Sequence, residues 1–411
     1  MSNLTIRDVR AIMTSPTGTA LSPGDGSLQK RLIVVKIETS EPGLYGLGCA
    51  TFTQRANAVR VIIDEFLKPL LVGRDPHRIE DIWQVVHHNA YWRSGPAENN
   101  AMSGVDQALW DIKGKVAGLP VYQLLGGKCR EAAAVYRHAG GATPQAVEDD
   151  LRRYMEAGYR YVRVQMGGYG GNASLPTPPE GAVPGTYFDP HGYALGAVEM
   201  FAHLRDKVGF GIELLHDVHE RMVPIEAVRL AKDLEPYRLF FLEDLLPPEH
   251  VEWFRMVRGL CSTPIAMGEL FNNPQEWKTL ITERLIDFIR CHISTIGGLT
   301  PARKLATFCE QFGVRTAWHG PGDVSPVGHA VNVHLDVASP NFGIQEWAGF
   351  SDLEQEIFPG CPELRDGYAY PNDKPGLGID IDEKLAARFP CPDGVLEWTQ
   401  TRYPDGTLCS P

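Results

Sequence analysis

The chain has 411 residues, of which 39 are Lys or Arg and 51 are Asp or Glu, so its formal net charge is −12. This length predicts two or three domains, or one barrel-sized domain with an addition. The acidic balance argues against nucleic acid or an anionic membrane as the main partner. No apolar run approaches the roughly 20 residues that span a bilayer, and residues 1–8 lack the apolar core of a signal peptide. We therefore expect a cytoplasmic enzyme whose eight scattered cysteines are free thiols.

The first 125 or so residues are expected to form strands followed by helices. Residues Leu32–Ile37 form a β-rich run, and the glycines between Gly43 and Gly48 predict a turn. Apolar residues recur at spacings of three and four in Asn100–Ala117, which predicts a helix that ends at Gly118. This part of the chain is therefore expected to be an α+β domain of residues 1–128.

From about Ala132 the pattern changes to short β-rich runs that alternate with amphipathic helical stretches. Such alternation predicts parallel strands with crossover helices, and eight strands suggest a closed barrel over residues 129–358. A doubly wound open sheet is the alternative, but no GxGxxG follows a first strand. The eight expected strands are Ala132–Arg137, Tyr161–Gln165, Ile212–His216, Leu239–Leu242, Pro264–Gly268, Ile286–Cys291, Arg315–Trp318 and Gly343–Gln345. The expected helices include Thr143–Ala157, Pro224–Leu234 and Pro301–Phe312.

Two segments do not fit this alternation. Residues Gly167–Asp189 are rich in glycine and proline, and a loop of this length in a compact domain is usually functional, often a lid. Residues 359–411 are again rich in glycine and proline. We expect them to run back over the amino-terminal domain.

Three acids follow three successive expected strands. Asp217, Glu243 and Glu269 are separated by 26 residues each time, which is one strand–helix unit. In a barrel these strand ends converge on one mouth, where three carboxylates repel one another unless a cation neutralises them. Oxygen ligands of this kind suit Mg²⁺ better than zinc. The alternative is that they are three unrelated acids at helix starts.

Further polar residues also follow expected strands. His219 comes two residues after Asp217 and is expected to point into the same mouth. The others are His138, Arg163, Arg290, His319 and Glu346. Polar residues at nearly every strand end are what a catalytic rim of a barrel requires.

With these residues in place, the chain resembles the enolase superfamily and, within it, the mannonate dehydratase subgroup, which includes starvation-sensing and D-galactonate dehydratase-like proteins. The resemblance covers nearly the whole chain. It is carried by residues 135–139 (VYRHA), 163–165 (RVQ), 215–221 (LHDVHER), 241–244 (FLED), 268–269 (GE), 319–321 (HGP), 343–346 (GIQE), 375–378 (PGLG) and 405–408 (DGTL).

The resemblance implies an α+β capping domain over a modified (β/α)7β barrel, with one Mg²⁺ on Asp217, Glu243 and Glu269. It implies dehydration of an aldonic acid, such as D-mannonate or D-gluconate, through an enediolate to a 2-keto-3-deoxy acid. Arg163 corresponds to the arginine that removes the C2 proton together with a tyrosine, and His219 to the acid that protonates the leaving C3 hydroxyl. The implied sugar contacts are His138, Glu269, Arg290, His319, Asp323 and Glu346.

The chain departs from the family pattern at several positions. The place of the catalytic tyrosine of efficient mannonate dehydratases holds Leu175. We expect Tyr169 to be the base instead, and Tyr187 to anchor the loop. Pro321 stands where efficient members tend to carry Ala. Thr53 and Gln54 stand where they carry a substrate-binding Asn, and Gln54 is expected to supply an equivalent amide.

These departures leave three readings of the function. The leading hypothesis is a Mg²⁺-dependent acid-sugar dehydratase with low activity on D-mannonate. A second is a diverged sugar-acid-binding member without dehydratase activity. A third, a racemase or epimerase, is less favoured because the Lys-x-Lys of such enzymes is replaced by Arg163-Val164-Gln165. The expected partners are a small acid sugar and further copies of the chain in a homo-oligomer.

Overall fold

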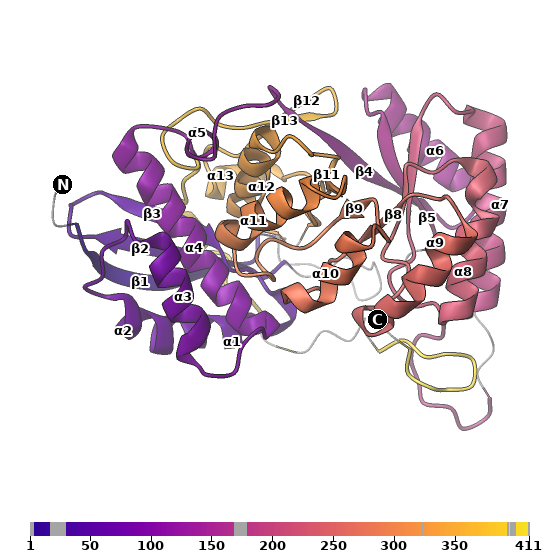
Figure 1. The fold of residues 1–411 in the computed structure, drawn as a ribbon, viewed down its shortest axis with the longest axis horizontal. Coiled ribbons are helices and arrows are strands. Elements are labelled where there is room, and N and C mark those ends of the chain that lie inside the picture. Colours follow the sequence, from indigo (N-terminus) through magenta and orange to yellow (C-terminus); the bar gives the residue numbers. More distant parts are fainter. Residues whose placement is uncertain are drawn as a thin grey trace.

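The computed structural model describes residues 4–16, 30–167, 179–322, 324–392, 394 and 400–409. The amino-terminal part begins with an antiparallel sheet of three strands in the order β1 (Ile6–Thr14), β2 (Leu32–Thr39) and β3 (Tyr45–Cys49). The sheet lies at one end of the molecule, beside the helices that follow it in the chain (Figure 1). The predicted order of strands and then helices is therefore confirmed.

Helices cover one face of this sheet. They are η1 (Thr53–Arg55), α1 (Ala56–Val61), the π-helical η2 (Ile62–Leu67), α2 (Lys68–Leu71), α3 (Ile79–Asn89), α4 (Pro96–Ala117) and α5 (Val121–Leu124). Helix α4 begins four residues before the predicted start because Pro96 is favoured in a first turn. It ends as predicted, at Gly118 with a left-handed φ of 68°.

The expected turn between Gly43 and Gly48 is wrong for its second half. Residues Tyr45–Cys49 form strand β3, and only the residues before them turn. The glycines serve a close approach of helix α4 instead. A Cβ atom on Gly46 would lie 2.0 Å from the carbonyl oxygen of Ala108, and one on Gly48 would lie 2.1 Å from that of Gly104. Glycine in a strand often marks such an approach of another backbone.

Eight parallel strands form the predicted barrel. They are β4 (Ala133–Gly141), β5 (Tyr161–Met166), β6 (Glu213–Asp217), β7 (Phe241–Glu243), β8 (Ile265–Met267), β9 (Phe288–Ile289), β10 (Arg315–Thr316) and β11 (Gln345–Glu346). Neighbours in sequence pair from β4 to β10, and β11 pairs with β4. A parallel bridge between Thr316 and Phe342 joins β10 to the residues before β11 and closes the ring.

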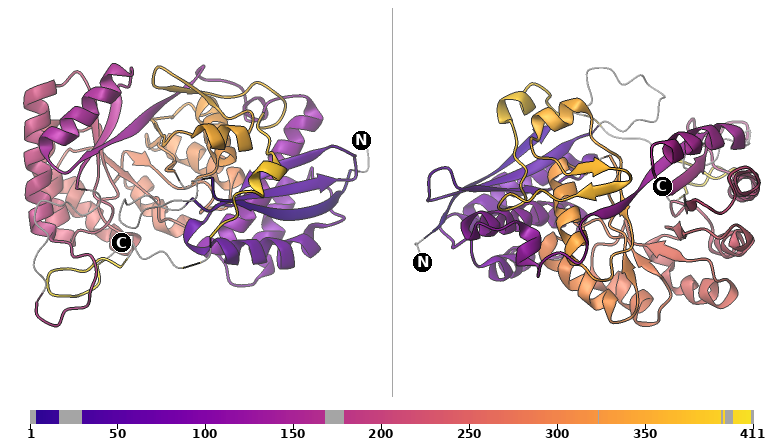
Figure 2. Two further views of the ribbon diagram at one scale, coloured as in Figure 1. Left: turned by 180° about the vertical axis from the view of Figure 1, so that it is seen from behind. Right: turned by 90° about the horizontal axis from the view of Figure 1, so that it is seen from above.

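Helices on the outside of the ring connect the strands (Figure 2). They are α6 (Pro144–Glu156), α7 (Pro190–Val208), α8 (Pro224–Asp233), η3 (Glu235–Tyr237), η4 (Pro248–Trp253), α9 (Phe254–Leu260), α10 (Pro274–Thr282), α11 (Leu299–Glu310) and α12 (Pro326–Ala338). Each predicted helix matches one of these to within two residues at each end. No helix in the described part of the chain is long and apolar enough to cross a membrane.

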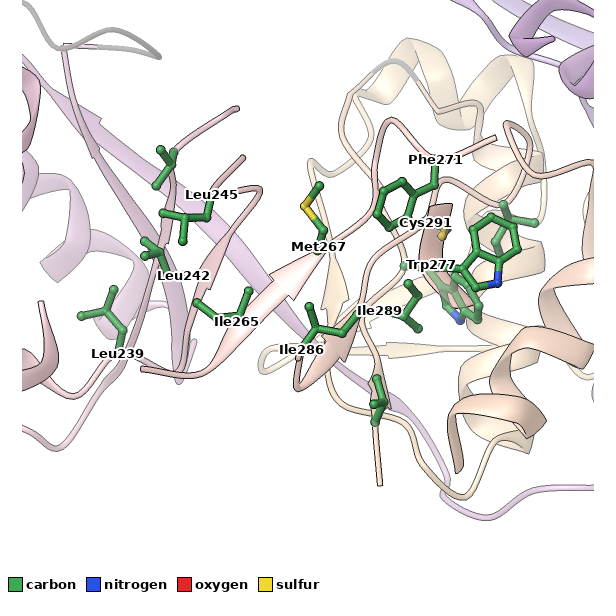
Figure 3. Close-up of a cluster of buried hydrophobic side chains, with 14 of the residues drawn as sticks. Leu239, Leu242, Leu245, Ile265, Met267, Phe271, Trp277, Ile286, Ile289 and Cys291 are labelled. Carbon is green, nitrogen blue, oxygen red and sulfur yellow. The ribbon is translucent and has the colours of Figure 1, made fainter. Parts of the chain in front are cut away.

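Alternation along the strands divides the barrel core into two layers. Outward side chains such as Leu242, Ile265 and Met267 pack against the helices in the largest apolar cluster (Figure 3). Inward side chains fill the barrel interior, and those buried there are Tyr136, Leu215, Phe241, Ala266, Phe288, Ala317 and Ile344. The interior is thus packed with side chains and is not a channel.

The segment after the barrel comprises α13 (Asp352–Ile357), β12 (Glu363–Arg365), β13 (Tyr368–Tyr370) and α14 (Glu383–Ala386). Strand β13 pairs antiparallel with β4. Helix α14 lies against the amino-terminal sheet (Figure 2), where Glu383 forms an ion pair with Arg10 at 2.7 Å. Residues 400–409 differ from the expectation for this segment, because they pair with Thr186 and Phe188 on the barrel side of the molecule.

Candidate active site

Most of the expected site residues share one position on their strands. Seven of them lie two residues after an inward-facing core residue, so they point into the barrel as well. They are His138, Arg163, Asp217, Glu243, Arg290, His319 and Glu346. Glu269 instead lies three residues after Ala266, and Gly268 between them has a φ of +136° that favours glycine. The structure therefore brings all eight residues to the mouth at the carboxyl ends of the strands.

Arg163 joins two of the expected metal ligands. Its Nη1 atom donates hydrogen bonds of 2.9 Å to Oδ2 of Asp217 and to Oε1 of Glu243. Both carboxylates are buried, with 1% and 0% of their surface exposed. A guanidinium is thus the cation nearest to these two acids in this structure.

Arg290 holds the remaining acids of the mouth. It donates from Nη1 to Glu269 at 2.8 Å and from Nη2 to Glu346 at 3.0 Å and Glu243 at 3.3 Å. Its Nη1 atom also lies 3.0 Å from Oδ2 of Asp244. Since Arg290 is completely buried, its guanidinium serves these carboxylates, and its expected contact with a sugar stays a prediction.

Three histidines lie around the same carboxylates. The Nε2 atom of His319 is 3.2 Å from Oε2 of Glu269, and that of His219 is 3.8 Å from Oε1 of the same residue. The Nε2 atom of His138 is 2.9 Å from Oε1 of Glu346. Burial would lower the pKa of His319, but Glu269 and Glu346 raise it to about 9. Burial would raise the pKa of Glu269, but His319, Arg290 and His219 hold it below its usual range.

The mouth holds more acids than bases. Glu220 and Asp244 join Asp217, Glu243, Glu269 and Glu346, so six buried or nearly buried carboxylates surround two guanidinium groups. Burial, together with the neighbouring acids, raises the pKa of Glu220 and of Asp244 well above the ordinary values. Oε1 of Glu220 accepts no hydrogen bond, and Oδ2 of Asp244 has only the ion pair with Arg290.

This excess of buried carboxyl groups over guanidinium groups fits a divalent cation, and the oxygen donors are of the type that Mg²⁺ prefers. In this structure, however, these acids are not arranged as the ligands of a metal ion. Within residues 4–16, 30–167, 179–322, 324–392, 394 and 400–409, no three His, Cys, Asp or Glu side chains are arranged as the ligands of a metal ion. The arginines lie between the acids instead, as the hydrogen bonds of Arg163 and Arg290 show.

The loop that carries His219 has an unusual backbone. His219 and Glu220 have φ angles of 56° and 60°, a left-handed conformation that few residues other than glycine adopt. The backbone N–H of His219 donates to Oδ1 of Asp217 at 2.8 Å, and that of Glu220 donates to the carbonyl oxygen of Asp244 at 2.7 Å. Strain of this kind is often found at functional sites.

Sequence reasoning missed several residues of the mouth. The hydroxyl of Tyr136 donates to Oε2 of Glu243 at 3.0 Å, and its place two residues before His138 could have indicated it. Asp244 could have been found as the residue next to Glu243. The hydroxyl of Tyr193 donates to the carbonyl oxygen of Asp217 at 3.1 Å from helix α7, for which the sequence offers no signal.

The remaining predicted residues lie at the edge of the site or outside the described chain. Tyr169 and Asp323 lie outside the described residues, so their roles stay predictions. The buried Tyr187 donates its hydroxyl to the carbonyl oxygen of Val183 at 2.8 Å.

Gln54 belongs to the capping part of the chain and is half-buried. It follows β3, whose last residue, Cys49, accepts a hydrogen bond of 3.3 Å from the Ser294 hydroxyl after strand β9. This contact brings the segment with Gln54 close to the barrel rim. Its role as a sugar contact stays a prediction.

Comparison with known proteins agrees with this architecture. Residues 1–126 match the family described as mandelate racemase / muconate lactonizing enzyme, N-terminal domain, and residues 146–385 match the enolase C-terminal domain-like family. The chain is 58% identical over 428 residues to the D-galactonate dehydratase family member RspA of Pantoea ananatis, with full coverage of both chains. It is 56% identical, again with full coverage of both, to a D-galactonate dehydratase family member of Musicola paradisiaca.

A solved structure extends the likeness to three dimensions. The crystal structure of an enolase from Pantoea ananatis, with bound D-gluconate and Mg, superposes with a TM-score of 0.95 at 57% identity. The match covers 99% of this chain and 100% of that one. The expected capping domain and barrel are thus confirmed, and the chain belongs to the enolase superfamily and, within it, to the D-galactonate dehydratase family.

Proposed function

We propose that this protein is a Mg²⁺-dependent dehydratase that removes water from an aldonic acid, such as D-gluconate or D-mannonate, to give a 2-keto-3-deoxy acid. The observation that carries this proposal is the excess of buried carboxylates over guanidinium groups at the barrel mouth. The relative that was crystallised with D-gluconate and Mg supports it, because the two chains are 57% identical over nearly their whole length.

Asp217, Glu243 and Glu269 would hold the metal. When bound, Mg²⁺ supplies the positive charge that binds the substrate carboxylate and makes the C2 proton acidic enough to remove. Arg163, whose Nη1 atom donates to both acids at 2.9 Å, would be released from them when the metal is bound. The freed guanidinium would then be available to the reacting end of the substrate.

The proton transfers fall to residues of the chain. We assign removal of the C2 proton to Arg163 together with Tyr169, and protonation of the leaving C3 hydroxyl to His219. The Nε2 atom of His219 lies 3.8 Å from Glu269, a proposed metal ligand, which supports this assignment. The hydroxyl leaves as water, and the resulting enol becomes the 2-keto acid by gaining a proton at C3.

We further propose low turnover on D-mannonate. Pro321 and the Thr53-Gln54 pair, at positions where efficient members of the resembling subgroup carry other residues, support this. Neither is among the proposed metal ligands, so these residues are expected to change substrate choice more than metal binding.

The test is incubation with Mg²⁺ and a set of aldonic and aldaric acids, with assays for 2-keto-3-deoxy products and for exchange of the C2 proton in D₂O. Product with at least one acid is expected. Thermal stabilisation by an acid sugar without C2 exchange would identify a non-catalytic binder. Exchange with inversion at C2 and no loss of water would identify an epimerase. Silence across the whole set, with Mg²⁺ binding shown by calorimetry, would contradict the proposal.

A further inference from the structure

Residues 400–409 form a small hairpin that is separate from the rest of the tail. The N–H of Cys409 donates to the carbonyl oxygen of Thr401 at 3.0 Å, and the N–H of Tyr403 donates to that of Thr407 at 2.8 Å. Gly406, with a φ of +91°, completes the turn between the two sides. These hydrogen bonds hold Arg402 and Tyr403 in place on one side of the hairpin.

The hairpin docks beside the barrel mouth, next to residues 179–189 (Figure 1). The N–H of Phe188 donates to the carbonyl oxygen of Arg402 at 2.7 Å, and the N–H of Arg402 donates to that of Thr186 at 2.9 Å. These bonds fix the neighbouring Tyr403. Its hydroxyl donates to the carbonyl oxygen of Arg221 at 3.0 Å.

That carbonyl belongs to the strained loop that carries His219. The loop runs from Asp217 to Arg221, and two of its residues have left-handed φ angles of 56° and 60°. The Tyr193 hydroxyl lies 3.1 Å from the carbonyl oxygen of Asp217 and shares its proton with Nε2 of His216 at 2.8 Å, and the Tyr403 hydroxyl donates to the carbonyl oxygen of Arg221. Two tyrosine hydroxyls from distant parts of the chain thus hold the two ends of one five-residue loop.

The two tyrosines are also connected to each other. The ring of Phe188 lies 5.5 Å from that of Tyr193 and 6.4 Å from that of Tyr403, measured between ring centroids. Phe188 is almost completely buried, so it forms a packed link between helix α7 and the hairpin. A movement of the hairpin would therefore alter the tyrosine contacts at both ends of the loop.

We propose that Tyr403 is a positioning residue, which holds the loop of residues 217–221 so that the imidazole of His219 stays next to Glu269. Few non-glycine residues adopt the backbone conformation of this loop unless their surroundings enforce it. Loss of the hydroxyl bond would let the loop relax and displace His219. This inference rests on the proposed function only in taking His219 as the acid of the dehydration.

The test uses Tyr403→Phe in the full-length protein, which removes one hydroxyl and keeps the ring against Phe188. Two readouts are expected to change. Hydrogen–deuterium exchange of the peptide covering residues 217–222 should become faster, because the amides of His219 and Glu220 lose protection. The ratio of dehydration to C2 proton exchange should fall about 10-fold, because the base is untouched while the acid is displaced.

Tyr45→Phe is the matched control. The Tyr45 hydroxyl also binds the tail, at 2.7 Å from Asp380, but it does so at the amino-terminal sheet. This variant should leave both readouts unchanged.

Amide exchange like that of the unmodified protein would overturn the proposal. So would faster amide exchange with an unchanged ratio, since Tyr403 would then hold the loop without positioning His219. If the unmodified protein shows neither C2 exchange nor dehydration with any acid sugar, the proposed function fails. Amide exchange would then decide the structural part of the inference by itself.

Discussion

The barrel mouth and the seam between helix α14 and the amino-terminal sheet both gather carboxylates, but they balance the charge differently. In the seam, Glu383 accepts hydrogen bonds from Arg10 at 2.8 Å and from Lys36 at 2.7 Å, and a third of its side chain is exposed. One acid thus faces two bases at the surface. In the mouth, six acids that water scarcely reaches share two arginines and three histidines.

The pKa values express this difference. The hydrogen bond from Arg10, helped by that from Lys36, lowers the pKa of Glu383 to about 2, so its charge favours the folded state at neutral pH. In the mouth, burial and like charges raise the pKa values of Glu220 and Asp244 well above the ordinary range. Their ionised forms therefore disfavour folding unless a cation is present. An excess of buried acid is better explained by function than by stability.

The largest expected effect comes from Glu243→Gln. The change removes one charge and keeps the shape, so Mg²⁺ affinity measured by calorimetry should fall at least about 100-fold, with a matching loss of activity. Without metal the variant should melt at a higher temperature, because one of the crowded charges is gone. Mg²⁺ should raise the melting temperature of the unmodified protein only.

The exposed Glu249 offers the control for this prediction. Glu249→Gln makes the same change of charge outside the mouth and should alter neither affinity nor activity. Unchanged Mg²⁺ affinity in Glu243→Gln would remove this acid from the proposed ligands.

A smaller effect is expected from His219→Asn. Asn tolerates the left-handed φ of 56° at this position, so the loop should persist. Dehydration should slow by about 10²–10⁴-fold, the usual contribution of a general acid, while C2 exchange and Mg²⁺ binding continue. His88→Asn, on the exposed end of helix α3, should have no such effect. Loss of C2 exchange together with dehydration would instead place His219 at the first proton transfer.

The smallest effect is expected in the seam. Glu383→Gln should lower the free energy of unfolding at pH 7 by about 1 kcal/mol, since a partly exposed ion pair is screened by solvent. Because the pKa of Glu383 is lowered to about 2, its contribution is complete above about pH 4.5 and is lost as the pH falls through 2. Urea unfolding from pH 7 to pH 3 should show the difference shrinking below about pH 4.5.

The solvent-exposed pair of Glu363 and Arg365 provides the comparison, and Glu363→Gln should leave stability unchanged. Activity should be unaffected in both variants. A loss of activity in Glu383→Gln would mean that the seam and the mouth are not independent.

The barrel and most of its mouth could be predicted because both depend on local pattern. Each strand is a short apolar run, and a polar residue two places beyond an inward side chain must point into the barrel, as Phe241 and Glu243 do. Strand β3 could not be predicted, because its glycines are required by contact with Gly104 and Ala108 of helix α4, which come more than fifty residues later.

The parts that could not be predicted depend on contacts between distant segments. Tyr193 and Tyr403 reach the mouth from helix α7 and from the terminal hairpin, and no spacing in the sequence relates either of them to Asp217 or Arg221. The same holds for the balance of charge. The sequence indicates which acids gather, but only the folded chain shows that Arg163 and Arg290 lie between them.

The hydrogen bond between Tyr403 and Arg221 also bears on the order in which the protein is made. The two residues are 182 positions apart in the chain. At a synthesis rate of about 5–20 residues per second, the loop with His219 leaves the ribosome roughly ten to forty seconds before its tyrosine partner. All the barrel strands, down to Glu346, emerge before Tyr403 does. The barrel can therefore close while the backbone at His219 is still free to relax. Maturation of the mouth is therefore expected to be a late event, after the barrel has closed.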